Sequence, residues 1–368
     1  MPTGLTPSRI PIRNAWLMLL YAWDMAHWRG AARVKAEDAP NLLGLLAWVL
    51  VESTQQLLRQ QLGRAHRQTT AEIQGIRGRL DFGASLRRRA FDAGRAVCRF
   101  PELSVDTLKN RIVRSSMKAL VRDQRLAPGA DNSRVGQLRH DLDAAVQAME
   151  GVTIIKVSGA DFAQLQLGRS ELAYRLPLKI CELIYEMQMP SETEGDAFLT
   201  ALVRDEMKMN KLFEAFVRNF YRYHLDGHDV RSEALGWPTA EATDHMPGMV
   251  TDITISDRRP PHQRTIIDTK FYGSALGINR FGQAKFHSAN LYQLYAYLRT
   301  QEGHGDSYRT ARGMLIYPTT DLELDVPFHL QGHDVRIVTL NLTAPWVEIE
   351  SRLLGWVVGT EPIHTDGA

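Results

Sequence analysis

The chain has 368 residues, a length that suits two domains, each large enough to bury its own core. Hydrophobic residues make up 44% of it and charged residues 23%, which is typical of a globular protein and excludes a disordered or fibrous chain. Its formal net charge is only +2, so the overall charge indicates no particular partner. The two cysteines, Cys98 and Cys181, are far apart and have no ligand-like spacing, which argues against a disulfide framework or a zinc site.

The sequence also argues against a membrane or secreted protein. Its most apolar run, residues 42–51, is about half as long as a helix that spans a bilayer. At the N-terminus, no charged region is followed by an apolar core and a small-residue cleavage site, as a secretory signal requires. We therefore expect a cytoplasmic protein.

The N-terminal half is predicted to be mixed and mainly helical. Apolar residues recur there at three- and four-residue spacings, and a strand with a turn interrupts the helices. The predicted helices cover residues 14–28, 42–62, 108–123, 135–149 and 174–189, and the strand and turn cover residues 71–82. Residues 190–196 are polar and rich in helix breakers, so we place a boundary there between domains of residues 1–190 and 197–368.

Basic residues are concentrated in one part of this half. Residues 59–139 contain 18 lysine and arginine residues against 7 aspartate and glutamate residues, a formal net charge of +11. Such an excess can follow the phosphates of a nucleic acid and give salt-sensitive affinity. A solvated face, or a surface that binds an acidic partner protein, explains the same pattern equally well.

The second half alternates between helices and strands. A helix is predicted over residues 207–223, strands over 249–255 and 265–272, a helix over 285–299, and strands over 312–317 and 335–340. Glycines at 273, 277 and 282 indicate a loop between the second of these strands and the second helix. The order is therefore helix, two strands, helix and two strands.

Two aspartates in this half interrupt runs of β-branched residues. Asp252 and Asp268 lie within the first two predicted strands, where an unpaired carboxylate is costly to bury. A divalent cation would neutralise both, and Mg²⁺ typically binds through one or two carboxylates together with phosphate oxygens. Side chains alternate along a strand, so Lys270 projects to the same side as Asp268 and could meet the same phosphate. Alone, such a pair is more often a solvated ion pair.

Further polar residues lie near these strands in sequence. Glu214, beside the apolar stripe of the first helix, is a possible third carboxylate for the metal or a solvated glutamate. On the next helix, Gln293 and Tyr297 are one turn apart, where they could support Lys270 or contact DNA, or simply form the polar edge of a packed helix. Lys285 is a candidate DNA contact, and His287 fits a capping or phosphate-contacting role better than a metal ligand.

In this order, Asp252, the Asp268-Thr269-Lys270 motif and the Gln293 to Tyr297 spacing resemble the PD-(D/E)xK nuclease superfamily, in particular its RecB-like branch. More closely, the chain resembles the McrC family, the nuclease subunits of McrBC modified-cytosine restriction systems. The matching blocks run from Ile-Pro-Ile-Arg-Asn at residues 10–14, through Gly-Ile-Arg-Gly-Arg-Leu-Asp-Phe at 75–82 and Asp-Thr-Leu-Lys-Asn-Arg-Ile at 106–112, to Asn-Leu-Tyr-Gln-Leu at 290–294.

The resemblance implies an α/β (α+β) fold. A mixed, mainly helical N-terminal domain would precede a restriction-endonuclease-like domain with a central mixed sheet flanked by helices. It also implies an Mg²⁺-dependent endonuclease with Asp252, Asp268 and Lys270 as catalytic residues, the two aspartates holding the metal. The partner would be an McrB-like AAA+ GTPase hexamer that recognises methylated cytosine in double-stranded DNA.

The resemblance further implies that the N-terminal half docks onto the ring and stimulates its GTPase. This sequence has no Gly-x-x-x-x-Gly-Lys-Ser/Thr loop, so GTP is expected on the partner. Two other functions stay open: a stand-alone RecB-like repair nuclease, and a non-catalytic adaptor of an AAA+ ring.

Overall fold

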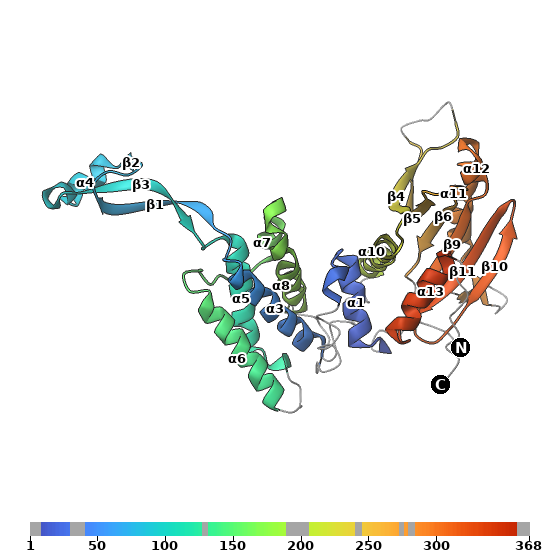
Figure 1. Cartoon of the computed structure of the whole chain (residues 1–368), viewed down its shortest axis with the longest axis horizontal. Coiled ribbons are helices and arrows are strands. Elements are labelled where there is room, and N and C mark those ends of the chain that lie inside the picture. Colours follow the sequence, from blue (N-terminus) through green and yellow to red (C-terminus); the bar gives the residue numbers. More distant parts are fainter. Residues whose placement is uncertain are drawn as a thin grey trace. The chain divides into compact units, whose positions relative to one another are not determined.

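A computed structural model describes residues 9–29, 41–126, 132–188, 206–239, 245–271, 276–278 and 284–358 (Figure 1). The chain forms two compact units. The inserted unit consists of Asp38–Pro190, and the sheet unit combines Met1–Glu37 with Ser191–Ala368. None of the described helices is long and apolar enough to cross a membrane.

The inserted unit contains a helical bundle and a two-stranded arm (Figure 1). Its elements are α3 (Leu42–Arg59), β1 (Ala65–Gln74), β2 (Arg79–Leu80), α4 (Phe82–Arg87), η3 (Ala90–Ala93), β3 (Arg95–Ser104), α5 (Leu108–Arg122), η4 (Gln124–Leu126), α6 (Asn132–Ala148), α7 (Gly159–Ala163), η5 (Arg169–Tyr174) and α8 (Arg175–Gln188). Helices α3, α5, α6 and α8 contact one another, and the apolar stripes predicted from the sequence form their buried interior, which includes Leu50, Ile112, Leu142 and Ile180.

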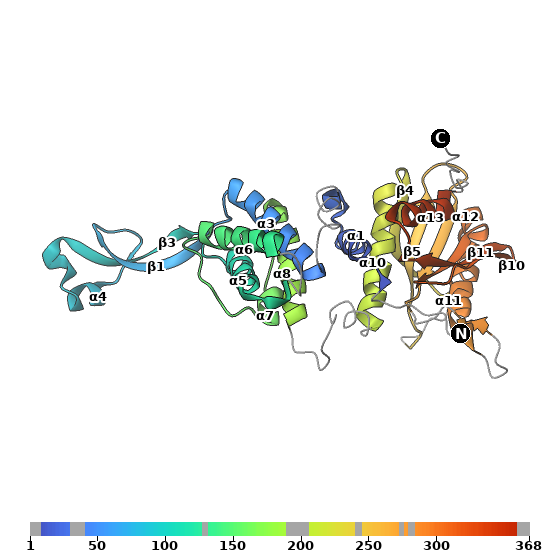
Figure 2. The same ribbon diagram turned by 90° about the horizontal axis from the view of Figure 1, so that it is seen from below.

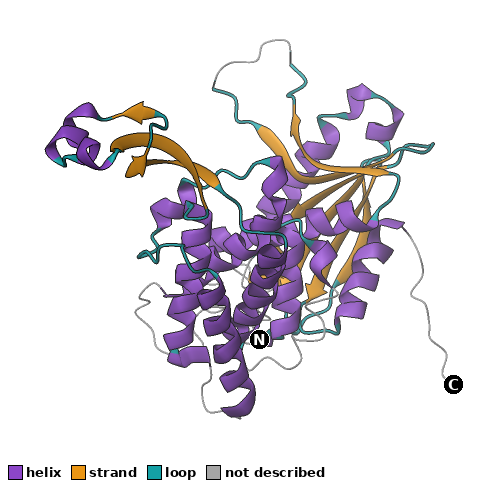
Figure 3. Cartoon of the chain, turned by 60° about the vertical axis from the view of Figure 1, so that its left-hand side comes forward, coloured by secondary structure: helices purple, strands orange, loops and turns teal. Residues whose placement is uncertain are grey.

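The arm is a ribbon of β1 and β3 that carries β2, α4 and η3 at its far end (Figure 3). Its strands pair antiparallel over ten residues each, from Ala65 with Ser104 to Gln74 with Arg95. The predicted strand at 71–82 overlaps β1 and β2, whereas β3 was not predicted. Strand β3 buries Ala96, Val97, Cys98 and Phe100, three of them consecutive, and its last residues are exposed, so its sequence lacks a period-two apolar alternation.

A buried carboxylate fastens the arm to the bundle. Asp106, between β3 and α5, accepts hydrogen bonds from Arg111 at 2.7 and 2.6 Å and from Arg67 of β1 at 3.1 Å. It also accepts from the backbone amide and hydroxyl of Thr153 at 2.8 and 2.9 Å. These donors, the Arg111 guanidinium first, hold the pKa of Asp106 well below its usual range. One residue thus joins β1, α5 and the segment after α6.

In the sheet unit, six described strands form one mixed sheet in the order β10-β11-β9-β6-β5-β4. The pairs β6–β9 and β9–β11 are parallel, whereas the pairs β4–β5, β5–β6 and β10–β11 are antiparallel. The elements are α1 (Ile12–Ala22), η2 (Ala26–Trp28), α10 (Glu206–His224), β4 (His228–Leu235), β5 (Met249–Asp257), β6 (Arg264–Thr269), β7 (Leu276–Ile278), β8 (Ala284–Phe286), α11 (Ser288–Arg299), η6 (Glu302–His304), α12 (Asp306–Arg309), β9 (Arg312–Thr319), β10 (Asp325–Leu330), β11 (His333–Asn341) and α13 (Trp346–Val358).

Helices cover both faces of this sheet (Figure 2). On one face, α11 packs its Leu294 and Leu298 against β6 and β9. Glycine at position 313 of β9 makes this close packing possible, because a Cβ there would lie 2.8 Å from Leu298 Cδ1. Helices α10 and α13 lie on the other face, where the rings of Phe216 and Trp346 are 5.9 Å apart. The sheet is therefore buried on both sides, as its long apolar strands β6 and β9 require.

The first helix belongs to the sheet unit, which corrects the predicted domain of residues 1–190. Helix α1 packs along α10, and Asn219 donates hydrogen bonds to the carbonyls of Tyr21 and Ala22 at 2.9 and 3.2 Å. The fully buried ring of Tyr21 stacks on Trp346, 5.8 Å away. An apolar helix fits any core, so the sequence alone could not assign it. Residues 190–196, where the boundary was predicted, lie outside the described residues.

Other elements also differ from the prediction. The helix predicted over residues 285–299 begins at Ser288, because Ala284–Phe286 instead pairs as β8 with β7. Two edge strands, β4 and β10, were not predicted, since neither shows a sustained apolar alternation; only two residues of β4 and none of β10 are buried. The predicted loop glycines 273 and 282 and residue 272 lie outside the described residues. The mixed α/β class itself is confirmed.

Candidate active site

The two predicted aspartates meet where β5 begins and β6 ends. The antiparallel ladder of these strands pairs Ile253 with Ile267 as its last residues, and the same register puts Asp252 next to Asp268 just beyond them. Asp268 is completely buried, whereas Asp252 is partly exposed. The structure therefore brings together carboxylates that are 16 residues apart in the sequence at one end of the sheet.

The Asp268 carboxylate is buried with little compensation. Among the described residues, the only polar group that reaches its oxygens is the Lys270 ammonium, with Nζ 2.9 Å from Oδ2. Burial, and secondarily the charge of Asp252, raise the pKa of Asp268 to about 7, while Lys270 acts in the opposite direction. The protein therefore holds this group close to the balance between its neutral and charged forms at neutral pH.

Lys270 is fixed from the other side by the helix that follows. Its Nζ donates to Gln293 Oε1 at 3.0 Å, Gln293 Nε2 donates to Tyr297 Oη at 2.6 Å, and Tyr297 Oη donates to the carbonyl of Val250 at 2.9 Å. The two helix residues are one turn apart in α11, so they face the same way. The predicted lysine, glutamine and tyrosine thus form one chain of hydrogen bonds that returns to the start of β5.

Asp252 has a different environment. Its Oδ2 accepts hydrogen bonds from both the backbone amide and the hydroxyl of Thr269, at 2.7 and 2.9 Å. The sequence analysis assigned no role to Thr269, because side-chain alternation points the middle residue of an Asp-x-Lys motif away from its neighbours. Only the point at which the ladder ends, which the sequence does not reveal, makes this contact possible.

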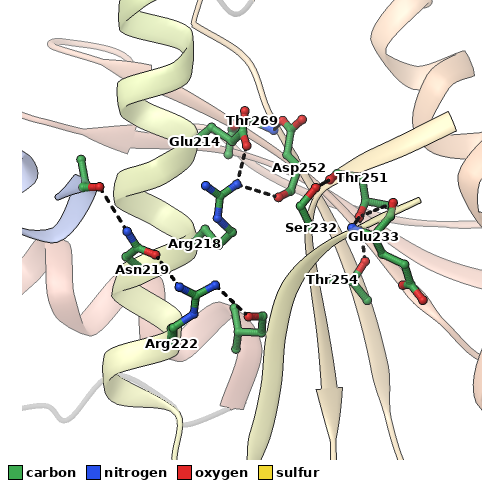
Figure 4. A network of polar contacts seen from close by, with 12 residues as sticks. Glu214, Arg218, Asn219, Arg222, Ser232, Glu233, Thr251, Asp252, Thr254 and Thr269 are labelled. Carbon is green, nitrogen blue, oxygen red and sulfur yellow. Dashed lines mark hydrogen bonds and ion pairs between the residues drawn. The ribbon is translucent and has the colours of Figure 1, made fainter. Parts of the chain in front are cut away.

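Glu214 approaches the site from α10, as Figure 4 shows. Its carboxylate is bound by Arg218, one turn further along the helix, and the same guanidinium reaches the backbone carbonyl of Asp252 at 3.4 Å. Burial and the nearby charge of Asp252 raise the pKa of Glu214. Arg218 was not predicted, and its only sequence signal is the four-residue spacing from Glu214.

The two residues predicted as DNA contacts precede α11 rather than lie within it. Lys285 is an exposed residue of β8, and His287 is the residue immediately before the helix, where its carbonyl accepts a hydrogen bond from Asn290. Nothing in their positions assigns them a ligand. Their role as DNA contacts stays a prediction.

The donor set at Asp252 and Asp268 fits a hard divalent cation. Oxygen ligands from one or two carboxylates are what Mg²⁺ usually takes from a protein, and the remaining ligands are water and substrate phosphate. Asp268 offers two buried oxygens whose only polar partner among the described residues is Lys270, and a cation would compensate their charge further. Among the described residues, no group of three or more histidine, cysteine, aspartate or glutamate side chains could hold a metal by itself.

Comparison with known proteins gives matches along most of the chain. A family model described as "McrBC 5-methylcytosine restriction system component" matches residues 15–318. The type IV methyl-directed restriction enzyme EcoKMcrBC of Escherichia coli (strain K12) is 30% identical over 349 residues, 94% of this chain and 96% of that protein.

Solved structures match as well. A refined half-complex from a tetradecameric assembly of Thermococcus gammatolerans McrB AAA+ hexamers with bound McrC matches with a TM-score of 0.54 and 18% identity, over 93% of this chain and 74% of that chain. At this identity the match bears on the fold alone. A cryo-EM structure of the Thermococcus gammatolerans McrBC complex matches over 57% of each chain, with 21% identity and a TM-score of 0.38.

These findings define the protein first as a restriction-system component with a mixed α/β fold. The chain belongs to the family of McrBC 5-methylcytosine restriction system components. The family resemblance inferred from the sequence is thereby confirmed.

Proposed function

We propose that this chain is the endonuclease subunit of its restriction system and that it hydrolyses DNA phosphodiester bonds at Asp252, Asp268 and Lys270. One observation carries the proposal: the carboxylate of the fully buried Asp268 lies beside a second carboxylate, and among the described residues its only polar partner is the Lys270 ammonium, 2.9 Å from Oδ2. A structural carboxylate at this depth is normally surrounded by donors. The arrangement therefore suits a site that is completed by a cation and a phosphate, as in PD-(D/E)xK nucleases.

We propose Mg²⁺ as the cofactor, held by Asp252 and Asp268, with Glu214 as a further carboxylate nearby. When bound, the cation would polarise the scissile phosphodiester and lower the pKa of an attacking water. The Lys270 ammonium would offset the negative charge that develops on the phosphate oxygens. Gln293 and Tyr297 keep that ammonium at one place, so its charge needs no reorganisation during the reaction.

The choice of DNA site is proposed to rest with a partner. The Escherichia coli relative is described as a methyl-directed enzyme, and the Thermococcus gammatolerans complex contains McrB AAA+ hexamers with bound McrC. By extension, an McrB-like GTPase ring would bind this chain, carry GTP and recognise methylated cytosine in double-stranded DNA. The inserted unit, with the basic excess of residues 59–139, would dock onto the ring and stimulate its GTPase. Such an enzyme would act in the cytoplasm.

Cleavage of a methylated plasmid tests the proposal. The full chain would be incubated with Mg²⁺ and plasmid, with and without its GTPase partner and GTP. A parallel series would contain Asp268→Asn and the matched control Asp257→Asn, which changes an aspartate at the opposite end of β5. We expect cleavage only with partner and GTP, its loss in Asp268→Asn and its retention in Asp257→Asn.

The alternatives give different results in the same assay. Cleavage without partner and GTP would favour a stand-alone repair nuclease. If Asp268→Asn cut as fast as the parent chain, the assignment of the active site would be wrong. Absence of cleavage under all conditions, with GTPase stimulation intact, would favour a non-catalytic adaptor.

A further inference from the structure

Thr269 makes two hydrogen bonds to one carboxylate oxygen. Its backbone amide and its hydroxyl both donate to Asp252 Oδ2, at 2.7 and 2.9 Å, and its side chain is almost fully buried. Thr269 is the middle residue of the Asp268-Thr269-Lys270 motif. This short segment therefore contributes the Asp268 carboxylate, the Lys270 ammonium and the two donors that bind the Asp252 carboxylate.

The backbone pattern explains why the Thr269 amide is available. Amide groups along a strand point alternately to its two neighbours, and the amide of Lys270 donates to the carbonyl of Ile316 in β9. The amide of Thr269 therefore points toward β5. The β5 ladder has already ended at Ile253 and Ile267, so the Asp252 side chain takes the place of the next backbone acceptor.

Two donors on one oxygen restrict the rotation of the carboxylate. The N–H and O–H directions differ, so together they fix both the position and the plane of the Asp252 carboxylate group. Metal-binding carboxylates generally depend on such hydrogen bonds for their orientation. Asp268, by contrast, is held mainly by burial and by its ion pair with Lys270. Thr269 is thus the residue that orients the Asp252 carboxylate relative to that of Asp268.

We propose that Thr269 is a positioning residue of the active site, which orients Asp252 so that both aspartates can bind one divalent cation. This inference rests on the proposed nuclease function. It predicts that losing the hydroxyl weakens cation binding, while the chemistry at saturating cation is largely retained. A hydrogen bond that served only to close the end of the sheet would affect thermal stability and not the cation.

Mg²⁺ titration of the full chain by isothermal calorimetry, without DNA, tests this directly. Thr269→Val keeps the shape of the side chain and removes its hydroxyl, and Thr269→Ser restores the hydroxyl. The matched control is Thr339→Val in β11 of the same sheet. It removes a buried hydroxyl that donates to the Leu322 carbonyl and accepts from the Leu324 amide. Thermal midpoints would be recorded for each variant, because both valine substitutions remove a buried hydrogen bond.

We expect the Mg²⁺ dissociation constant to rise about tenfold in Thr269→Val, at the lower end of the range for residues that orient metal ligands, because the backbone amide bond remains. Thr269→Ser should bind within about twofold of the parent, and Thr339→Val should bind like the parent although it melts lower. In cleavage with partner and GTP, Thr269→Val should need about tenfold more Mg²⁺ for half-maximal rate.

The outcomes separate this inference from the function on which it rests. Mg²⁺ binding by the parent chain with no change in Thr269→Val would overturn the role of Thr269 alone. The role of Thr269 would also be overturned if Thr269→Ser did not restore the Mg²⁺ affinity and Thr339→Val lost as much affinity as Thr269→Val. That result would indicate that lower stability weakens Mg²⁺ binding in general. No Mg²⁺ binding by the parent chain would overturn the proposed function and this inference together. Should Thr269→Val fail to fold, Thr269→Ala serves in its place with the same expected shift.

Discussion

Each unit of this chain contains a buried aspartate, and the two differ in how far neighbouring donors compensate the carboxylate charge. Asp106 at the base of the arm has a side chain that is 6% exposed, and it receives donors from Arg111, Arg67 and Thr153. Asp268 in the sheet is 0% exposed, and its only polar partner among the described residues is the Lys270 ammonium, 2.9 Å from Oδ2.

The pKa of each group reflects this difference. Hydrogen bonds lower the pKa of Asp106, so its charged form is the favoured one in the folded state. Burial raises the pKa of Asp268 to about 7, so its charged form is disfavoured until a cation or a ligand compensates it. A carboxylate surrounded by donors stabilises a fold, whereas one that is left short of donors is available for chemistry.

Replacing the charge of Asp268 should have the largest effect. Asp268→Asn keeps the volume of the side chain and removes the anionic ligand, so cleavage of methylated plasmid by the complete complex should fall at least about 1,000-fold. The corresponding Asp106→Asn variant should retain most of its activity at a temperature where it is folded. An equal loss of cleavage activity in both variants would show that the two aspartates do not have different roles.

Removing the lysine should have the next largest effect. Lys270→Met keeps the length of the side chain and loses the ammonium, which should lower the cleavage rate by about 100- to 1,000-fold at saturating Mg²⁺. Lys179→Met, which removes a lysine paired with Glu182 outside the basic stretch of residues 59–139, is the matched control. A Lys270→Met enzyme as fast as that control would exclude Lys270 from the reaction.

The same substitution at the two aspartates should change stability in opposite directions. Asp106→Asn loses a buried charge that several donors require, and it should destabilise the inserted unit by about 2–3 kcal/mol at pH 8. Asp268→Asn removes a buried charge that Lys270 compensates only in part, and in the presence of a chelator it should stabilise the sheet unit by up to about 4 kcal/mol at pH 8. Thermal melting of both variants with EDTA checks the two signs, and a loss of stability in Asp268→Asn would contradict the account.

The pH dependence follows from the same pKa values. The folded-state pKa of Asp268 is raised, so its ionisation costs stability progressively as the pH rises from about 4 to about 7. The stabilisation by Asp268→Asn should therefore shrink as the pH is lowered from 8 toward 4. Asp106 has a lowered pKa, so its contribution is present above about pH 4 and is lost on acidification below it. Melting curves of both variants and the parent chain across this range would measure the two trends.

The sequence predicted the part of the site that depends on local periodicity. Period two along a strand puts Asp268 and Lys270 on one side, and one helical turn puts Gln293 and Tyr297 on one side, so these pairs follow from spacing. The structure joins the two pairs through Lys270 and Gln293. Residues that act through tertiary structure were missed, because the contact of Thr269 depends on where a ladder ends.

The fold shows the same division. Strongly amphipathic helices such as α5 and α10 were predicted within one or two residues of their bounds, whereas strands β3, β4 and β10, which lack a sustained apolar alternation, were not predicted. The membership of α1 in the sheet unit depends on the rings that surround Tyr21, which come from α10 and α13. No local pattern in an apolar helix reveals which core it joins.

Calorimetric titration of Mg²⁺ into three forms of the full chain tests the central claim most directly, since it asks whether Asp268 is held for a cation. The account predicts that the parent chain and Asp106→Asn bind Mg²⁺ with similar affinity at pH 8, and that Asp268→Asn shows no binding over the same range. Binding by Asp268→Asn with the affinity of the parent chain would contradict it.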